Sequence, residues 1–165
     1  MELIASADNN WGIGKDGGLL FTVPEDMCRF RLLTTGNIVV MGKATCLSLP
    51  QKDGIPRPLP GRENIVLTHD PGFSPAGFTV LPDTDTLFSY VAGREEKVFL
   101  IGGASLYRQL LPCCDRAYIT RFFRDFPADR YLPDLDADPD WRLAATSARY
   151  SYQGVDYQFC TYKRR

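Results

Sequence analysis

An acidic residue lies in line with apolar residues in the segment LLFTVPEDMCRF, which spans residues 19–30. Pro24 predicts the start of a helix, because proline fits the first helical turn, where its missing N–H is not needed. Asp26, Phe30 and Leu33 follow at the i, i+4, i+7 spacing of one helical face. A carboxylate on such a face needs hydrogen-bond donors, either from the protein, as a satisfied buried acid, or from a bound ligand.

Two glycine-containing segments could bind an anion or a planar ligand. VVMGKAT places Gly42 after an apolar run, with Lys43 and Thr45 at a helix start, where backbone amides, a hydroxyl and an ammonium would converge on an anion. VFLIGGASLY ends a predicted strand in Gly102 and Gly103, a pair that lets the backbone approach a ligand closely. Ligands of open α/β sheets bind beyond the carboxyl ends of strands, so the two segments together predict a pocket for a phosphorylated, planar cofactor. The alternatives are an ordinary glycine turn with an exposed lysine and plain helix–strand packing.

A third glycine segment, GIGKDG at residues 12–17, matches the pattern G-x-G-x-x-G. A true dinucleotide-binding fingerprint opens directly into a helix. Here Gly18, Leu19 and Leu20 follow, and the next helix signal is Pro24. We therefore reject a Rossmann interpretation. The glycine content predicts a mobile loop, with a passive surface connection as the alternative.

The elements that position these residues follow from the apolar patterns. Strands are predicted within residues 2–8, 37–42, 64–68, 78–81, 97–103 and 116–122, and two more around a turn at Gly154 in the tail 148–165. Helices are predicted at 24–34, 43–50, 83–93 and 104–112, and loops at 9–18 and 50–63. Strands that alternate with helices early and stand alone late predict an α/β fold, as a single domain over residues 1–165, with a mainly parallel sheet and an antiparallel C-terminal edge.

Composition excludes several classes of protein. The chain has 165 residues, 44% of them hydrophobic, and a formal net charge of −1, so we expect one globular domain and no nucleic acid partner. No apolar run is long enough for a membrane span, and the N-terminal segment has no basic region typical of a secretory signal. Five cysteines without a C-x-x-C pattern, and His69 as the single histidine, predict neither disulfides nor a metal site. We expect a cytoplasmic protein.

Five segments occur in the order and spacing of one known family: PEDMCRF, VVMGKAT, RPLPGRENIVLT, VFLIGGASLY and AYIT. From Leu3 to the terminal KRR, the chain resembles dihydrofolate reductase, and the aspartate in its pocket is typical of the bacterial type. The resemblance implies a monomeric α/β domain with an eight-stranded, mainly parallel sheet, an antiparallel C-terminal strand and about four flanking helices. It also implies NADPH-dependent reduction of 7,8-dihydrofolate to 5,6,7,8-tetrahydrofolate, by hydride transfer to pterin C6 with protonation at N5, and binding of antifolate inhibitors.

The resemblance places Asp26 at the pterin as the catalytic residue, where its carboxylate would accept from N3–H and the 2-amino group as a bidentate pair. Thr120 would share this network. Arg62 would bind the α-carboxylate of the glutamate tail, with Arg57 at the rim, because an arginine fork matches a carboxylate. The remaining substrate residues that it implies are Ile4, Met27, Phe30, Leu49, Leu59 and Ile101. The alternatives are simple core packing for Phe30 and Leu49 and a solvated charge for Arg62.

For the cofactor, the resemblance implies contacts near the nicotinamide, the phosphates and the adenosine. The implied residues are Ala5, Ile13, Gly42, Lys43, Ala44, Thr45, Thr68, His69, Gly102, Gly103, Ala104, Ser105, Leu106 and Tyr107. Lys43 would face the 2′-phosphate, and the family has a cis peptide between the two glycines of VFLIGGASLY. His69 could also be a plain loop histidine, and Tyr107 a core aromatic. Residues 12–20 would form a lid loop, with Asp129 from the segment 121–132 as its partner.

Three positions depart from the common bacterial pattern of this family. Phe21 and Cys46 stand where tryptophans are usual, and Ser105 stands where an arginine often supports the 2′-phosphate. A phenyl ring cannot donate the hydrogen bond with which the indole holds a water near the pterin. Without the arginine, Lys43 carries the charge at the phosphate more alone, which makes the preference for NADPH over NADH less secure.

Two other functions compete with this interpretation. The related reductase of riboflavin synthesis acts on a pyrimidine, but Arg62 and Asp26 favour folate. A non-catalytic nucleotide- or folate-binding module is a different class, to which the two lost tryptophans lend slight support. NADPH absorbance with and without dihydrofolate separates the three.

Overall fold

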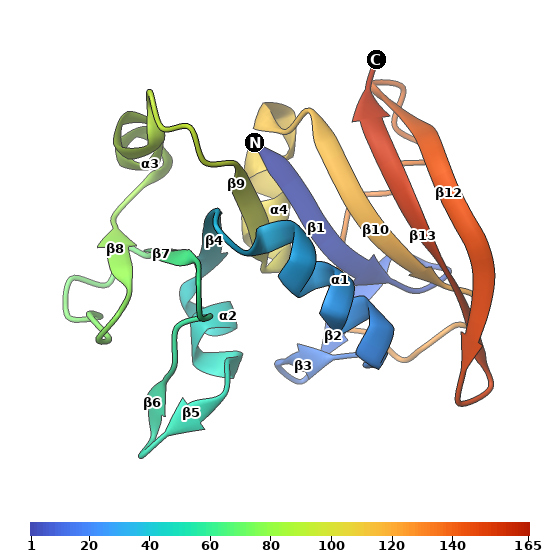
Figure 1. Cartoon of the computed structure of the whole chain (residues 1–165), viewed down its shortest axis with the longest axis horizontal. Coiled ribbons are helices and arrows are strands. Elements are labelled where there is room, and N and C mark those ends of the chain that lie inside the picture. Colours follow the sequence, from blue (N-terminus) through green and yellow to red (C-terminus); the bar gives the residue numbers. More distant parts are fainter.

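An eight-stranded sheet forms the centre of the computed structural model, which describes all 165 residues (Figure 1). Its strand order is β12-β13-β10-β1-β9-β4-β7-β8. The bounds are β1 Glu2–Ala7, β4 Ile38–Gly42, β7 Glu63–Leu67, β8 Thr79–Leu81, β9 Val98–Gly102, β10 Arg116–Phe122, β12 Trp141–Tyr152 and β13 Val155–Arg164. Every neighbouring pair is parallel except the two pairs that include β13. The predicted mainly parallel sheet with an antiparallel C-terminal strand is confirmed.

Four helices flank the sheet, as expected. They are α1 Pro24–Thr34, α2 Lys43–Ser48, α3 Thr84–Val91 and α4 Ala104–Leu110, followed by a 3₁₀ turn at Leu111–Cys113. In Figure 1, α1 crosses in front of the sheet and α4 lies behind it. α1 begins at the predicted proline, and Asp83 caps α3 by accepting a hydrogen bond from the Thr86 N–H at 2.7 Å. No helix is long and apolar enough to cross a membrane.

The two segments predicted as loops contain short hairpins, so the loop assignments were wrong in part. The additional strands are β2 Gly12–Lys15, β3 Gly18–Leu19, β5 Gln51–Lys52, β6 Ile55–Pro56 and β11 Arg130–Tyr131. Asp16–Gly17 and Asp53–Gly54 form the two-residue turns, with positive φ at all four positions. Asp-Gly is the dipeptide that this turn favours, because both of its central residues need positive φ. The segment that matched G-x-G-x-x-G therefore forms a β-hairpin and does not open into a helix. This agrees with the rejection of a Rossmann interpretation.

The last hairpin is longer than predicted. β12 begins at Trp141, whereas the tail pattern predicted strands only from residue 148. Trp141 and Leu143 pair with Arg164 and Tyr162 of β13. Apart from the buried Trp141, the early part of β12 is largely exposed, because it is the edge of the sheet, and it lacks the long apolar run that marks a buried strand.

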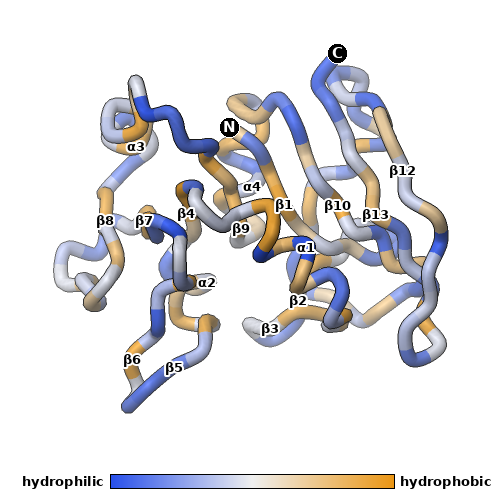
Figure 2. Tube along the Cα trace, in the orientation of Figure 1, coloured by the Kyte–Doolittle hydropathy of each residue, from blue (hydrophilic) through white to orange (hydrophobic).

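Both faces of the sheet are buried in its centre, where the strands are hydrophobic (Figure 2). Along β1, Leu3 belongs to the largest buried cluster together with Leu106 of α4. Its neighbour Ile4 belongs to a second cluster, against which Phe30 and Leu33 of α1 pack. The predicted apolar face of α1 therefore covers the sheet, and Asp26 lies on that same face.

Candidate active site

A cavity of about 930 Å³ opens where the central strands end. β1 pairs with β9 only as far as Leu3 and Leu100, whereas its pairing with β10 continues to Ala7 and Arg121. The carboxyl ends of β1 and β9 thus separate, and the space between them is lined by residues from both strands and from the turns that follow β4 and β9. Such a separation beyond the carboxyl ends of strands is the usual ligand site of an open α/β sheet.

The structure brings nearly all predicted site residues to this cavity. Of the residues predicted for the substrate, those that line it are Ile4, Asp26, Met27, Phe30, Leu49, Leu59 and Ile101. Every residue that was predicted for the cofactor lines it as well, from Ala5 and Ile13 to the α4 turn that ends at Tyr107. The exceptions are Thr120, Arg62 and Arg57, which are described below.

Asp26, in the first turn of α1, is tied to β10. Its carboxylate accepts a hydrogen bond of 2.5 Å from the hydroxyl of Thr120, which is buried. No other donor of the chain bonds this carboxylate, so its second oxygen is available to a molecule in the cavity. Burial raises the pKa of Asp26 above its usual value, while the Thr120 hydrogen bond and the charge of Arg29 oppose that rise. The acid on the apolar face therefore has one partner in the protein and room for another.

Tyr107 links α4 to β1. Its buried hydroxyl donates a hydrogen bond of 2.8 Å to the backbone carbonyl of Ile4. Burial raises the pKa of Tyr107 far above its ordinary value, so the hydroxyl stays protonated and remains a donor. The Ile4 carbonyl is thereby held in one orientation.

Backbone from the two glycine turns meets in the cavity wall. A Cβ on Gly102 would lie 3.0 Å from the Thr45 hydroxyl, and one on Gly42 would lie 3.9 Å from the Gly103 nitrogen. The Gly102–Gly103 peptide is cis, as the resemblance implied. Neither α2 nor α4 has a side-chain N-cap, so the first amides of both helices lack a side-chain partner. These amides, which no side chain caps, and the Thr45 hydroxyl are donors that fit the diphosphate of a dinucleotide.

Lys43 is engaged in an ion pair that the sequence did not predict. Its ammonium lies 2.7 Å from a carboxylate oxygen of Asp70 and 5.2 Å from the ring centre of Phe73. The hydrogen bond from Lys43, followed by one from the Gly72 N–H, lowers the pKa of Asp70. Lys43 thus lines the cavity, but its charge is already balanced by Asp70.

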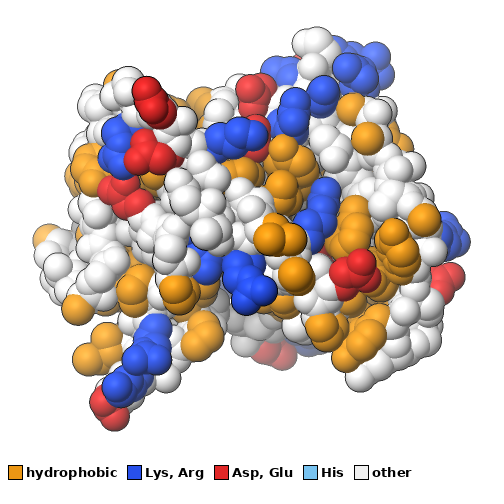
Figure 3. Space-filling model, viewed as in Figure 1, with side chains coloured by type: hydrophobic (Ala, Val, Ile, Leu, Met, Phe, Trp, Pro, Cys, Tyr) orange, Lys and Arg blue, Asp and Glu red, His pale blue; other side chains and the backbone are white.

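A second hollow, of about 440 Å³, is lined by Met27, Phe30 and Leu59, which also line the large cavity. Arg62 lines it and donates to the Pro60 carbonyl at 2.9 Å and to the Thr34 hydroxyl at 3.1 Å, but pairs with no carboxylate. Burial, and then the neighbouring charge of Arg31, lower the pKa of Arg62. On this face, basic and hydrophobic side chains lie side by side over α1 (Figure 3).

Arg31 also lines this hollow, and the sequence analysis did not identify it. The sequence could have indicated Arg31 only through its position next to Phe30 in α1. Arg57 is exposed and lines neither of the two cavities, so the structure does not place it with Arg62. Arg57 follows the β5–β6 hairpin, and its N–H donates to the Pro50 carbonyl. The guanidinium groups of Arg31 and Arg62, which pair with no carboxylate, suit an anionic end of a ligand.

The predicted lid loop closes one side of the large cavity and is paired with the segment 121–132. The Asp129 carboxylate accepts from the Asp16 N–H at 3.0 Å, and the Asp129 N–H donates to the Gly14 carbonyl at 3.0 Å. β2 pairs with β11 on one side and β3 on the other. The expected contact between the lid and Asp129 is present.

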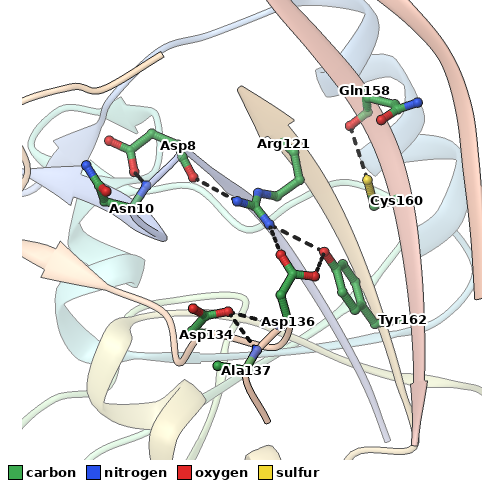
Figure 4. A network of polar contacts seen from close by, with 9 residues as sticks. All are labelled: Asp8, Asn10, Arg121, Asp134, Asp136, Ala137, Gln158, Cys160 and Tyr162. Carbon is green, nitrogen blue, oxygen red and sulfur yellow. Dashed lines mark hydrogen bonds and ion pairs between the residues drawn. The ribbon is translucent and has the colours of Figure 1, made fainter. Parts of the chain in front are cut away.

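A polar network fixes the start of the lid (Figure 4). The buried Asp8 carboxylate accepts from the N–H groups of Asn10, Gly12 and Phe126, at 2.8 to 2.9 Å. The Arg121 guanidinium lies over the Trp11 ring at 3.9 Å and pairs with Asp136 at 3.0 Å, and Asp136 also accepts from the Tyr162 hydroxyl. The lid is thus held at its start by Asp8 and Arg121 and near its turn by Asp129.

The residues that replace the usual tryptophans are both packed among apolar groups. Phe21 lies against Phe122, Phe126 and Tyr152, with ring centres 5.5 to 6.1 Å apart. Cys46 is fully buried, and burial raises the pKa of its thiol. Neither residue lines the cavity, so neither supplies a polar group to it.

The chain is similar to several proteins along its whole length. A family model described as dihydrofolate reductase matches residues 1–164. The dihydrofolate reductase of Bacillus subtilis (strain 168) is 34% identical over 167 residues, covering 100% of this chain and 95% of that protein. That of Neisseria gonorrhoeae is 35% identical over 163 residues, with 98% and 96% covered. A solved dihydrofolate reductase from Enterococcus faecalis, complexed with NADP(H) and RAB-propyl, superposes with a TM-score of 0.84 at 31% identity, covering 99% of this chain and 95% of that one.

Proposed function

This chain belongs to the dihydrofolate reductase family, and from that membership we propose that it reduces 7,8-dihydrofolate to 5,6,7,8-tetrahydrofolate with NADPH. The observation that carries the proposal is Asp26, a carboxylate in the cavity wall with one protein donor and a free oxygen. A pterin supplies the two parallel donors that this carboxylate lacks, through N3–H and the 2-amino group.

The substrate would lie between α1 and the separated strands. Asp26 accepts from the pterin, and the backbone carbonyls of Ile4 and Ile101 face the same ring. Met27, Phe30, Leu49 and Leu59 form the apolar walls, and Arg62 binds the α-carboxylate of the glutamate tail. Two features support this orientation: the unpaired guanidinium of Arg62 and its distance of 5.9 Å from the Phe30 ring centre, which places charge and apolar wall side by side.

For the cofactor, the chain offers a backbone surface and one ammonium. The amides after Gly42 and Gly103, with Thr45, hold the diphosphate. Lys43 is the side chain available for the 2′-phosphate, and Thr68 and His69 border the adenosine. When bound, NADPH supplies the hydride that pterin C6 receives. Ile13 and the rest of the lid exclude water from the reacting atoms.

Protonation at N5 completes the reduction. No acidic side chain other than Asp26 lines the pterin end of the cavity, so we propose that water delivers this proton. The ionised Asp26 carboxylate favours the protonated pterin, because opposite charges attract strongly in a partly buried site. The role of Asp26 is thus to orient the ring and to stabilise positive charge on it.

Three further proposals rest on the same support. The whole chain, residues 1–165, forms one catalytic domain, which acts as a monomer in the cytoplasm. Antifolate inhibitors bind in the pterin part of the cavity; the relative from Enterococcus faecalis was solved with a second ligand beside NADP(H). No nucleic acid and no membrane takes part.

The test is the loss of NADPH absorbance with and without dihydrofolate. We expect oxidation that depends on dihydrofolate and saturates with it. Oxidation with a pyrimidine of the riboflavin pathway but not with dihydrofolate would replace this proposal by the related reductase. A flat trace in the presence of tight NADPH binding would identify a non-catalytic binding module.

A further inference from the structure

The end of the cavity at β7 and β8 has an unusual balance of charge for a site that is to bind a phosphate. Three ionisable side chains line it: Lys43, His69 and Asp83. Asp70 adds a fourth, because its carboxylate lies 2.7 Å from the Lys43 ammonium. Two carboxylates and one ammonium therefore lie at this end, so the formal charge of its Asp and Lys side chains is negative.

Asp70 is held in place as an ionised group. One carboxylate oxygen accepts from the Gly72 N–H at 3.0 Å, and the other accepts from Lys43. The Asp70 N–H donates to the Thr68 hydroxyl at 3.2 Å. The hydrogen bonds from Lys43 and Gly72 keep the pKa of this carboxyl low, so it carries its charge at neutral pH. Both side chains of the pair are 41% exposed, but the hydrogen bonds to Gly72 and Thr68 fix Asp70 in the turn after β7, within reach of Lys43.

No other basic side chain that lines the cavity offsets the negative charge at this end. The remaining basic residues that line the cavity are Lys15 on β2 and Arg130 on β11, in the small sheet of the lid. That sheet packs beside β1, which is four positions from β8 in the order of the main sheet. Ser105 at the start of α4 lines the cavity with an uncharged hydroxyl.

We propose that Asp70 is a specificity-determining residue that weakens selection for the 2′-phosphate, so that the protein prefers NADPH over NADH only weakly. This inference rests on the proposed function. A 2′-phosphate that uses Lys43 must separate it from Asp70 and then lie beside the Asp70 carboxylate. A ribose 2′-hydroxyl instead can donate to the Asp70 carboxylate and leaves the ion pair intact, which is how acidic residues select NAD in other dinucleotide sites.

The experiment compares dissociation constants of NADPH and NADH, measured by isothermal titration calorimetry without dihydrofolate. For the unmodified protein we expect the two constants to agree within about 30-fold. Asp70→Asn keeps the acceptor for the Gly72 N–H but frees the Lys43 charge. It should tighten NADPH by about tenfold and change NADH less than about threefold.

The matched control is Asp53→Asn, which removes the same charge from an exposed turn outside the cavity. Asn suits the positive φ of 55° at that position. It should leave both constants unchanged. Asp70→Ser is a second variant that removes the charge and keeps a shorter oxygen acceptor, and it should reproduce the selective gain.

Two results would overturn the inference: unmodified protein that binds NADPH more than about 30-fold tighter than NADH, or Asp70 variants that change both constants equally or leave both unchanged. Both leave the proposed function intact, because NADPH still binds. If the protein bound neither dinucleotide and dihydrofolate caused no oxidation, the proposed function itself would fail, and the inference with it.

Discussion

Asp26 is the residue on which the chemistry of this site depends, and opposing effects set the pKa of its carboxyl group. Burial disfavours its charge, and Thr120 and Arg29 favour it. Arg29 lies one helical turn along α1, with its guanidinium 4.6 Å from the Phe159 ring centre and no carboxylate paired with it. The sequence analysis identified the acid and Thr120 but not Arg29, because its effect depends on burial.

A raised pKa has a consequence for stability that can be measured without substrate. Because the pKa of Asp26 is higher in the folded protein than in the unfolded chain, ionisation of Asp26 destabilises the fold as pH rises through that range. Asp26→Asn removes this cost and should increase the free energy of unfolding at pH 7 by on the order of 1 kcal/mol. The gain should vanish in acid, where the wild-type carboxyl is protonated. Urea unfolding at both pH values is the check, and a variant that is less stable at pH 7 would contradict the effect of burial.

Lys43 and Asp70 show where prediction from single residues ends. The motif VVMGKAT correctly placed a lysine beside the cavity, but its carboxylate partner is 27 residues further along the chain. Nothing in local spacing marks such a pair, because the turn after β7 and the start of α2 come together only in the folded sheet, where β4 pairs with β7. Arg31 was missed for a related reason, since an exposed helical arginine is ordinary until the hollow beside it is known.

At the scale of elements, the long periodic segments were predicted well and the short ones were not. α1, the buried strands and the capped α3 follow from periodicity, proline and Asp83. The β2–β3 and β5–β6 hairpins have strands of two to four residues, too short to show alternation. Their Asp-Gly dipeptides could have predicted the hairpin turns, but the glycine and proline content around them led to a prediction of loops.

The lid is the element whose position we expect to affect turnover most. Asp129→Ala removes the acceptor for the Asp16 N–H while leaving its own backbone bond to Gly14. Amides of residues 14–18 should exchange faster with deuterium, and kcat should fall by roughly 5-fold to 10-fold, with a smaller change in KM for dihydrofolate.

The control for this lid prediction is Asp125→Ala. Asp125 lies in the same segment, and its carboxylate bonds no other group of the protein. It should leave both exchange and kcat unchanged. Faster exchange in both variants, or unchanged exchange of the lid amides in the Asp129 variant, would contradict the role assigned to the Asp129 carboxylate.

At the scale of the whole molecule, the site exists because the sheet opens. The order of strands, with β13 inserted between β10 and β12, could not be predicted from apolar runs, since these show that strands exist but not which ones pair. The separation of β1 from β9 after two paired residues is likewise a property of the assembled sheet. Resemblance to a family supplied the number of strands and the expected ligand, and the glycine turns indicated only at which edge of the sheet the site lies.

The measurement that tests the central claim most directly is the pH dependence of turnover in Asp26→Asn. If Asp26 favours the protonated pterin, the variant should be slowed by about 100-fold or more at pH 7. At pH 5 the deficit should shrink, because the solution then protonates the substrate before the hydride arrives. The variant should remain folded at both pH values, so unfolding would not account for the loss. An equal loss of rate at every pH would contradict the role assigned to Asp26.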